Sequence, residues 1–420
     1  MRGFLSVART EQVRGDSKQT CSVWGKALRK KRCKGDCVDG FLRAKKERED
    51  LGVTALDEQI ERICRRFQIA GEYLRYELVT YGHINTTYKV FFFRDGEIKD
   101  YILQKVNTYV FKNPVEVMRN IITVTEHIRA KIKEVKATAK RDVLHYQQTE
   151  SGDYYLFTCK KEFWRCSRFI DGSKTYLKAK DAKMMEEAGK AFGSFQKYLS
   201  DYPVEGLHIA IPHFHNTVMR FEALKSVVSA DPYARVAGVR DVIEEYLKLE
   251  EIATEVYKRQ NADILPLRVT HNDTKCSNIL FDEETDEHLA VIDLDTVMPG
   301  LVAFDFGDAI RAGASTAEED EKDLLAVALD MEKYESFARG FLAELREDIT
   351  QAEKDSLALG AVAMTLECGA RFLTDYLDGD QYFRTEYEEH NLVRAKNQLA
   401  LGKDMIKRLG EMEHIIKKYS

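Results

Sequence analysis

Strand patterns and helix patterns occupy different parts of this chain, and that segregation constrains its fold more than any other feature. Residues 73–157 contain stretches rich in β-branched and aromatic residues, which are typical of strands. From Asp181 onward the apolar residues recur at helical spacing, interrupted by short apolar strands near Val269, Ile279 and Val291. The pattern therefore predicts an α+β fold, in which a small antiparallel sheet precedes a larger, mainly helical region.

The predicted sheet has five candidate strands. The second and third are joined by Arg94-Asp95-Gly96-Glu97, a hairpin sequence because Asp-Gly tolerates the positive φ of tight turns. Pro114 opens a helix with apolar residues every three to four positions over about five turns, and we expect this helix to lie on the sheet. A shorter helix is expected from Leu56, ending at Gly71. The strand candidates are residues 73–80, 86–93, 100–106, 143–148 and 154–157.

The distribution of charge sets the N-terminal segment apart. The 420 residues include 64 Lys and Arg and 70 Asp and Glu, for a net charge of −6. Residues 1–50 alone hold 14 basic and 7 acidic residues, a local excess of +7. We therefore expect residues 1–55 to form a basic, disordered extension that contributes nothing to the chemistry. Its three cysteines are too irregularly spaced, and too far from any His, to favour a zinc site.

The composition also limits the classes of function. No run of about eighteen apolar residues is present, so we expect no membrane-spanning helix. Eight cysteines over this length do not resemble a disulfide framework, which favours a cytoplasmic location. An acidic chain lacks the positive surface that nucleic acids require. We therefore expect small-molecule partners, with no nucleic acid, no membrane and no obligate protein partner.

Polar residues with catalytic potential gather between residues 268 and 295. Asp273 and Asn278 lie five positions apart between two apolar strands, and Asp293 ends the next apolar strand. Asp273 can accept a hydroxyl proton, while Asn278 and Asp293 offer the oxygen ligands that Mg²⁺ prefers. Phosphoryl transfer needs an oriented nucleophile and a metal that neutralises phosphate charge. The alternative is that these residues only cap turns, as Asn and Asp often do; their occurrence together favours the catalytic interpretation.

These residues also carry a resemblance to a known family. His271-x-Asp273, Asn278 and Ile-Asp293 resemble the active-site motif of the aminoglycoside phosphotransferase and choline kinase group. Within that group, longer strings are similar to the N-acetylhexosamine 1-kinase family, from about residue 60 to about residue 401. The strings are residues 81–88, 101–104, 267–275, 292–300, 304–311, 367–372 and 389–394.

The resemblance implies a two-lobed protein-kinase-like fold, with a sheet-containing N-lobe over residues 56–170 and a helical C-lobe over residues 171–420. It implies Mg²⁺ as cofactor, ATP as co-substrate, and phosphorylation of the anomeric hydroxyl of N-acetylglucosamine or N-acetylgalactosamine. By position, Asp273 resembles the catalytic base, and Asn278 and Asp293 resemble the metal ligands.

Three further positions match sugar-contacting residues of that family: His83, Arg371 and Tyr382. A neutral sugar is held mainly by directional hydrogen bonds, which these side chains supply. From the residues alone, the alternatives are a surface turn residue for His83, a structural salt bridge for Arg371 and core packing for Tyr382.

The sequence offers two candidates for the residue that binds the nucleotide phosphates. The chain has no P-loop, so the phosphates are expected under the loop from Gly82 to Thr87 or against the metal. Gln104 stands where a kinase fold has its phosphate-binding lysine, while Lys105 is adjacent and points to the other face of the strand. Either Gln104 suffices or a bulge turns Lys105 toward the phosphates.

Asp305-Phe306-Gly307 spells the magnesium motif of protein kinases, but Asp293 already occupies the metal position. We therefore expect Asp305 to have an architectural role near His271. Two alternatives to the sugar kinase remain: a kinase of the same fold for an aminoglycoside, choline or homoserine, and an inactive nucleotide- or sugar-binding module. A cationic substrate would call for a strongly acidic pocket, and the acidic run 318–321 is instead expected to be a solvated helix face.

Overall fold

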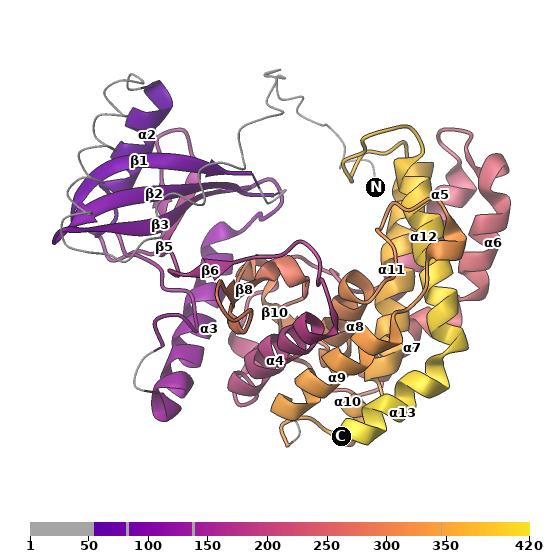
Figure 1. Cartoon of the computed structure of the whole chain (residues 1–420). Coiled ribbons are helices and arrows are strands. Elements are labelled where there is room, and N and C mark those ends of the chain that lie inside the picture. Colours follow the sequence, from indigo (N-terminus) through magenta and orange to yellow (C-terminus); the bar gives the residue numbers. More distant parts are fainter. Residues whose placement is uncertain (1–53, 81–83, 137–138, 346) are drawn as a thin grey trace.

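The computed structural model describes residues 54–80, 84–136, 139–345 and 347–420, which form two lobes (Figure 1). The sheet-containing N-lobe occupies one side of the molecule and the helical C-lobe the other, as the order of patterns in the sequence predicts. The N-terminal extension and His83 lie outside the described residues, so the predictions for them stay predictions.

The N-lobe sheet has five strands in the order β1-β2-β3-β5-β4, with antiparallel neighbours throughout. The Asp95-Gly96 hairpin is confirmed: it joins β2 to β3, and both residues have positive φ. Helix α2 begins after Thr54, whose side chain accepts a hydrogen bond from the backbone N–H of Asp57 at 3.1 Å. The bounds are α2 Ala55–Cys64, β1 Glu72–Val79, β2 Thr86–Arg94, β3 Glu97–Val106, β4 Leu156–Phe157 and β5 Phe163–Arg168.

The helix predicted from Pro114 is confirmed as α3, Pro114–Val135. Its apolar face packs in a core that also includes residues of the C-lobe, such as Val297. The buried Asn120 fastens this junction, because its Nδ2 donates to the carbonyl oxygens of His208 and Val297 at 2.7 and 3.0 Å. Helix α3 therefore belongs to the interface between the lobes, beneath the sheet in Figure 1.

In the N-lobe sheet, one predicted strand is wrong and one strand was not predicted. Residues 143–148 are not a strand; they form a loop beside β5, with a single bridge from Tyr146 to Ser167. The strand that pairs with β3 in the sheet is β5, whose first five residues are all buried. A strand buried on both faces shows no polar–apolar alternation, which is why its sequence gave no signal.

The C-lobe is built around α11, Leu357–Leu377, which packs against α5, α7, α8 and α12. Helix α11 is long and apolar enough to cross a membrane, but 83% of its apolar window is buried, so here it is a core helix. It crosses α8 closely, because a Cβ on Gly307 would meet the carbonyl oxygen of Gly360 at 2.3 Å. The helices are α4 Ala182–Tyr198, α5 Thr217–Ala230, α6 Arg240–Lys248, α7 Glu250–Asn261, α8 Val302–Gly313, α9 Met331–Leu345, α10 Gln351–Lys354, α12 His390–Lys407 and α13 Leu409–Tyr419.

Two small sheets of the C-lobe hold the loops that contain the polar motifs. Strand β7 pairs with β10, and β8 lies between β6 and β9. Two short 3-10 turns complete this region: η4 precedes β8, and η5 follows β9. The bounds are β6 Ser173–Lys174, β7 Arg268–Thr270, η4 Cys276–Asn278, β8 Ile279–Asp282, β9 His288–Val291, η5 Leu294–Thr296 and β10 Met298–Gly300.

Candidate active site

The loop after β7 is fastened to the turn after β9 by reciprocal hydrogen bonds. The carbonyl oxygen of Asn278 accepts from the N–H of Ile292 at 2.8 Å, and the Nε2 of His271 contacts the carbonyl oxygen of Ile292 at 2.8 Å. Asp293 directly follows Ile292. The fold therefore brings the loop of Asp273 and Asn278 against the turn of Asp293, as the motif spacing predicts.

Within the loop, Asp273 and Asn278 are in direct contact. The Nδ2 of Asn278 donates to the backbone oxygen of Asp273 at 2.8 Å and to its Oδ2 at 3.0 Å. The amide nitrogen of Asn278 donates to Asp273, and its Oδ1 makes no hydrogen bond with the residues that the structure describes. An amide oxygen of this kind suits a hard cation such as Mg²⁺.

Asp293 lies where negative charge accumulates. Desolvation by the surrounding protein, followed by repulsion from Asp295 and Asp273, raises the pKa of Asp293. The side chain is itself exposed, so desolvation is incomplete and solvent can reach the carboxylate. Its backbone is left-handed, with φ +59°, which is uncommon for a residue other than glycine. Such a concentration of carboxylates favours a cation.

The donor set fits a magnesium ion that is shared with a nucleotide. Among the described residues, no three His, Cys, Asp or Glu side chains are grouped to hold a metal alone. Mg²⁺ is commonly bound by one or two carboxylates together with substrate phosphates and water. Asn278 and Asp293 supply that kind of incomplete set.

Lys275 adds a positive charge beside Asp273. Its Nζ lies 2.8 Å from the Oδ1 of Asp273. Burial opposes the charged form, but attraction from Asp273 outweighs it and raises the pKa of Lys275. The sequence reasoning assigned this lysine no role, although it belongs to the shared string 267–275. The ion pair holds a positive charge beside the carboxylate of Asp273.

Asp305 holds the loop, as predicted. Its carboxylate accepts hydrogen bonds from the N–H groups of His271 and Asn272 at 2.8 and 2.7 Å, and from the Nε2 of Gln196 at 2.7 Å. Burial raises the pKa of Asp305, while these donors oppose the shift. All three donors stabilise an ionised carboxylate, so Asp305 is an internal brace.

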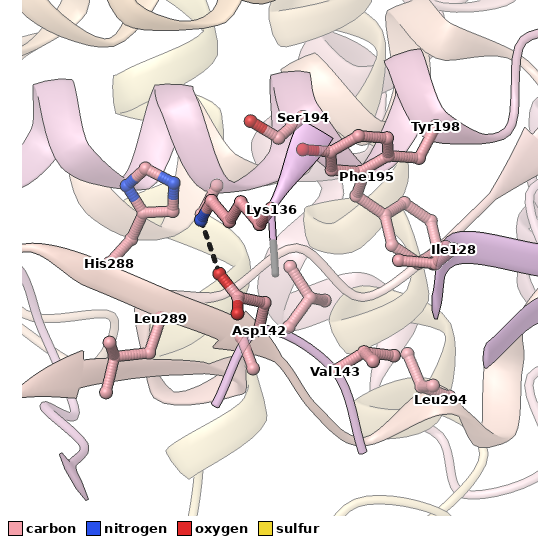
Figure 2. Close-up of a pocket in the computed structure, with 13 residues that line it drawn as sticks. Ile128, Lys136, Asp142, Val143, Ser194, Phe195, Tyr198, His288, Leu289 and Leu294 are labelled. Carbon is pink, nitrogen blue, oxygen red and sulfur yellow. Dashed lines mark hydrogen bonds and ion pairs between the residues drawn. The ribbon is translucent and has the colours of Figure 1, made fainter. Parts of the chain in front are cut away.

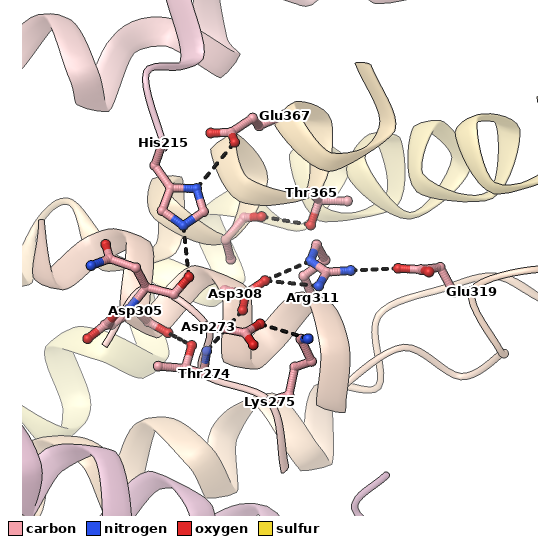
Figure 3. A network of polar contacts seen from close by, with 12 residues as sticks. His215, Asp273, Thr274, Lys275, Asp305, Asp308, Arg311, Glu319, Thr365 and Glu367 are labelled. Atoms are coloured by element: carbon pink, nitrogen blue, oxygen red, sulfur yellow. Dashed lines mark hydrogen bonds and ion pairs between the residues drawn. The ribbon is translucent and has the colours of Figure 1, made fainter. Parts of the chain in front are cut away.

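Two further groups brace the same loop (Figure 3). The Oδ2 of Asp308 accepts from the N–H of Thr274 at 3.0 Å. His215 bridges to helix α11: its Nε2 lies 3.0 Å from the carbonyl oxygen of Asn272, and its Nδ1 lies 3.2 Å from the Oε1 of Glu367. Burial opposes the charged imidazole, but Glu367 outweighs it and raises the pKa of His215. When protonated, the ring donates at both nitrogens and so connects α11 to the residue before Asp273.

Arg371 lies one helical turn beyond Glu367 on α11. It makes no hydrogen bond or ion pair with the part of the chain that the structure describes, so the alternative of a structural salt bridge is not observed. Instead its guanidinium carbon lies 5.4–5.9 Å from the ring centroids of Phe214, Tyr382 and Phe383. An unpaired guanidinium among aromatic rings is suited to bind a ligand.

Tyr382 is exposed, with 71% of its surface accessible, so the alternative of core packing is wrong. The carboxylate of Asp375 fixes its loop by accepting the N–H groups of Gln381, Tyr382 and Phe383 at 2.8–2.9 Å. The fixed loop therefore presents an exposed aromatic ring beside Arg371.

On the N-lobe, Gln104 and Lys105 point to opposite faces of β3, as the alternation predicts. The Nε2 of Gln104 donates to the Oγ1 of Thr87 at 3.1 Å. Lys105 instead lies 3.5 Å from the Oε1 of Glu162. The pairing of β3 with both neighbours runs without a register shift, so no bulge turns Lys105 round.

A cavity lies elsewhere, between α3, α4 and β9 (Figure 2). Its volume is about 70 Å³, and Lys136 and Asp142 form an ion pair of 2.6 Å in its wall. Pockets for small ligands typically measure about 300–1,000 Å³. None of the predicted site residues lines this cavity.

The two lobes, the Asp273 loop and the Asp293 turn define a kinase-like fold of the class that phosphorylates small molecules. A family model described as the phosphotransferase enzyme family (APH) matches residues 82–345. The chain belongs to this family, which implies ATP as co-substrate.

Solved structures agree on the fold. A choline kinase from Cryptosporidium parvum is 14% identical, with a TM-score of 0.53 over 86% of this chain and 99% of that one. An aminoglycoside phosphotransferase from Alicyclobacillus acidocaldarius is 10% identical, with a TM-score of 0.53 over 85% and 96%. The microcompartment-associated aminopropanol kinase is 14% identical, with a TM-score of 0.52 over 85% and 98%. At these identities the likeness concerns the fold alone.

Proposed function

We propose that this phosphotransferase is an N-acetylhexosamine 1-kinase, which transfers the γ-phosphoryl group of Mg-ATP to the anomeric hydroxyl of N-acetylglucosamine or N-acetylgalactosamine in the cytoplasm. The observation that carries the choice of acceptor is the unpaired Arg371 beside the exposed Tyr382. The other sugar-contacting residue in this proposal is His83.

The charge near Arg371 argues against a cationic acceptor. Burial, followed by repulsion from Arg371, lowers the pKa of Arg220, so two guanidinium groups lie near each other here. Glu367 is the nearby counter-charge, but its Oε1 already faces His215. An aminoglycoside, choline or another amine would meet like charge, whereas an acetylated sugar is neutral and offers oxygens to Arg371.

In the proposed reaction, the Oδ atoms of Asp273 orient the anomeric hydroxyl and accept its proton as the oxygen attacks the γ-phosphorus. The bond from that phosphorus to the bridging oxygen of ADP breaks, and ADP leaves with the electron pair. Lys275 offsets charge on the transferred group. Asn278 and Asp293 would hold Mg²⁺, which when bound neutralises phosphate charge. Thr87 and Gln104 would border the nucleotide, and Lys105 stays assigned to it only by its sequence position.

The test is ADP release measured over a panel of N-acetylglucosamine, N-acetylgalactosamine, glucose, choline, homoserine and kanamycin, with ³¹P NMR of each product. We expect turnover with the N-acetylated hexoses and phosphate at C1. Asp273→Asn should lower turnover by about two to four orders of magnitude, the usual scale for loss of a general base. Turnover with an amine instead would favour the same-fold alternative, and nucleotide binding without any turnover would favour an inactive module.

A further inference from the structure

Asp295, in the turn that follows Asp293, is connected to the N-lobe by a buried network. The Nη1 and Nη2 of Arg165, on β5, both donate to its carboxylate, the second at 3.0 Å. The Nδ2 of Asn85, just before β2, donates to the Oδ2 of Asp295 at 2.6 Å. Arg165 and Asp295 are each no more than 3% exposed. One C-lobe carboxylate is thus bound to two separate elements of the N-lobe.

The network extends through the sheet. The Nε of Arg165 donates to the Oε1 of Gln104 at 3.0 Å, and Gln104 in turn donates to Thr87. The strand register explains this arrangement, because Gln104 is paired with Thr87 on one side and with Arg165 on the other. Asn85 is fixed as well, since its Oδ1 accepts from the N–H of Asn107 at 2.9 Å.

The network joins the two places where a nucleotide would be held. Asn85 and Thr87 lie at the start of β2, where phosphates are expected, and Asp295 lies two residues after the proposed metal ligand Asp293. Gln104, in the position of the usual phosphate-binding lysine, has both ends of its amide engaged in the network. The guanidinium of Arg165 is buried and occupied by Asp295, so it organises the site without reaching a phosphate.

We propose that Arg165 and Asp295 are positioning residues, which hold the metal-binding turn in register with the start of β2 so that Mg²⁺ and nucleotide phosphates are bound together. Attraction from Asp295 outweighs burial and raises the pKa of Arg165. This inference rests on the part of the proposed function that assigns Asp293 to the metal, and does not depend on the identity of the acceptor.

The variant that tests the inference replaces both partners, as Arg165→Met with Asp295→Leu. Removing one partner would leave a buried, unpaired charge, whereas replacing both with apolar side chains of similar size commonly preserves stability. The matched control is Arg141→Met with Asp282→Leu. That pair also joins the two lobes, with the Nη2 of Arg141 at 2.8 Å from the Oδ2 of Asp282, but it lies outside the network.

Titration calorimetry with ADP, with and without Mg²⁺, gives the readout, and thermal unfolding reports on the fold. We expect the double variant to bind ADP with Mg²⁺ about 10- to 100-fold more weakly, the usual scale for losing a group that orients a metal ligand. Its affinity for ADP without Mg²⁺ should change by less than about threefold, and the control pair should match the wild type in both conditions.

A folded double variant with wild-type Mg-ADP affinity would overturn the inference, as would an equal loss with and without Mg²⁺. Asn85→Ala is a milder variant, which removes a hydrogen bond to Asp295 and leaves the ion pair in place. If the double variant does not fold, this variant tests the inference. It should weaken Mg-ADP binding while ADP alone is unaffected, and no effect on Mg-ADP would count against the network. A failed sugar assay leaves these binding results unchanged, so the two proposals fail separately.

Discussion

Asp305→Asn distinguishes an internal brace from a metal ligand at the Asp-Phe-Gly sequence. The wild-type carboxylate accepts from the N–H groups of His271 and Asn272 and from the Nε2 of Gln196. Asparagine keeps one accepting oxygen and places an NH₂ group against the remaining donor. An unsatisfied buried donor costs about 1–3 kcal/mol, and the two surviving bonds lose about 1 kcal/mol each without the charge.

Part of that loss is recovered, because burial raises the pKa of Asp305 and a neutral amide avoids the cost of burying a charge. We therefore expect the free energy of unfolding to fall by about 2–4 kcal/mol, measured by urea denaturation followed by circular dichroism. Asn272 has a left-handed backbone, with φ +63°, and directly precedes Asp273. Without the carboxylate of Asp305, the backbone at Asn272 is held less firmly, which should displace Asp273 and lower kcat by about tenfold or more.

The Mg²⁺ concentration for half-maximal activity should not change in this variant. Asp323→Asn is the matched control, since Asp323 accepts one N–H, that of Leu325, at 3.1 Å in an exposed turn. Its effect on the free energy of unfolding should stay within about 0.5 kcal/mol. If the Asp305→Asn variant is as stable as the control but needs a much higher Mg²⁺ concentration for half-maximal activity, then Asp305 binds the metal and is not an internal brace.

Three further variants test other parts of the account. His215→Gln should be less stable than the wild type below pH 6.5, and this difference in stability should shrink at higher pH. The reason is that Glu367 raises the pKa of His215, and the stabilising charge of the imidazole is lost as the pH rises through that raised pKa. Denaturation at pH 6 and pH 9 measures the difference, and a difference that does not depend on pH would contradict this prediction. Tyr382→Ala should raise the KM for the sugar about tenfold and leave the KM for ATP unchanged. Tyr382→Phe keeps the aromatic ring, so its KM for the sugar should stay near that of the wild type. An equal increase in this KM in both variants would contradict stacking. Lys105→Ala should alter the KM for ATP by less than about threefold, because Lys105 pairs with Glu162 on the face of the strand opposite to Gln104. A large increase in the KM for ATP would indicate that Lys105 binds the phosphates.

Local signals explain what the sequence predicted correctly. The Asp95-Gly96 turn, the periodicity after Pro114 and the spacing from Asp273 to Asn278 all act over a few residues. They located the hairpin, α3 and the loop that the fold places against Asp293. The braced position of Asp305 was also predictable, because another carboxylate already occupied the metal position in the motif.

Contacts between distant parts of the chain were not predictable. Arg165 and Asp295 are 130 residues apart, and His215 and Glu367 are 152 apart. Each is an ordinary charged residue in its local context, and only the fold pairs them. Glu367 did lie in a shared string, but a shared residue does not reveal its partner. Strand β5 was missed for a related reason, since its burial comes from distant segments: Phe163 lies in a core with residues of α3, and Trp164 lies in a core with residues of α2.

The central claim is that Asn278 and Asp293 hold one divalent ion beside Asp273. A crystal structure with Mn²⁺ and a non-hydrolysable ATP analogue tests it directly, since manganese is located by its anomalous scattering. We expect the ion within about 2.0–2.3 Å of the Oδ1 of Asn278 and the carboxylate of Asp293, bridging phosphate oxygens, with Asp273 facing the γ-phosphate. An ion bound by Asp305, or a nucleotide bound with no metal at Asp293, would contradict the account.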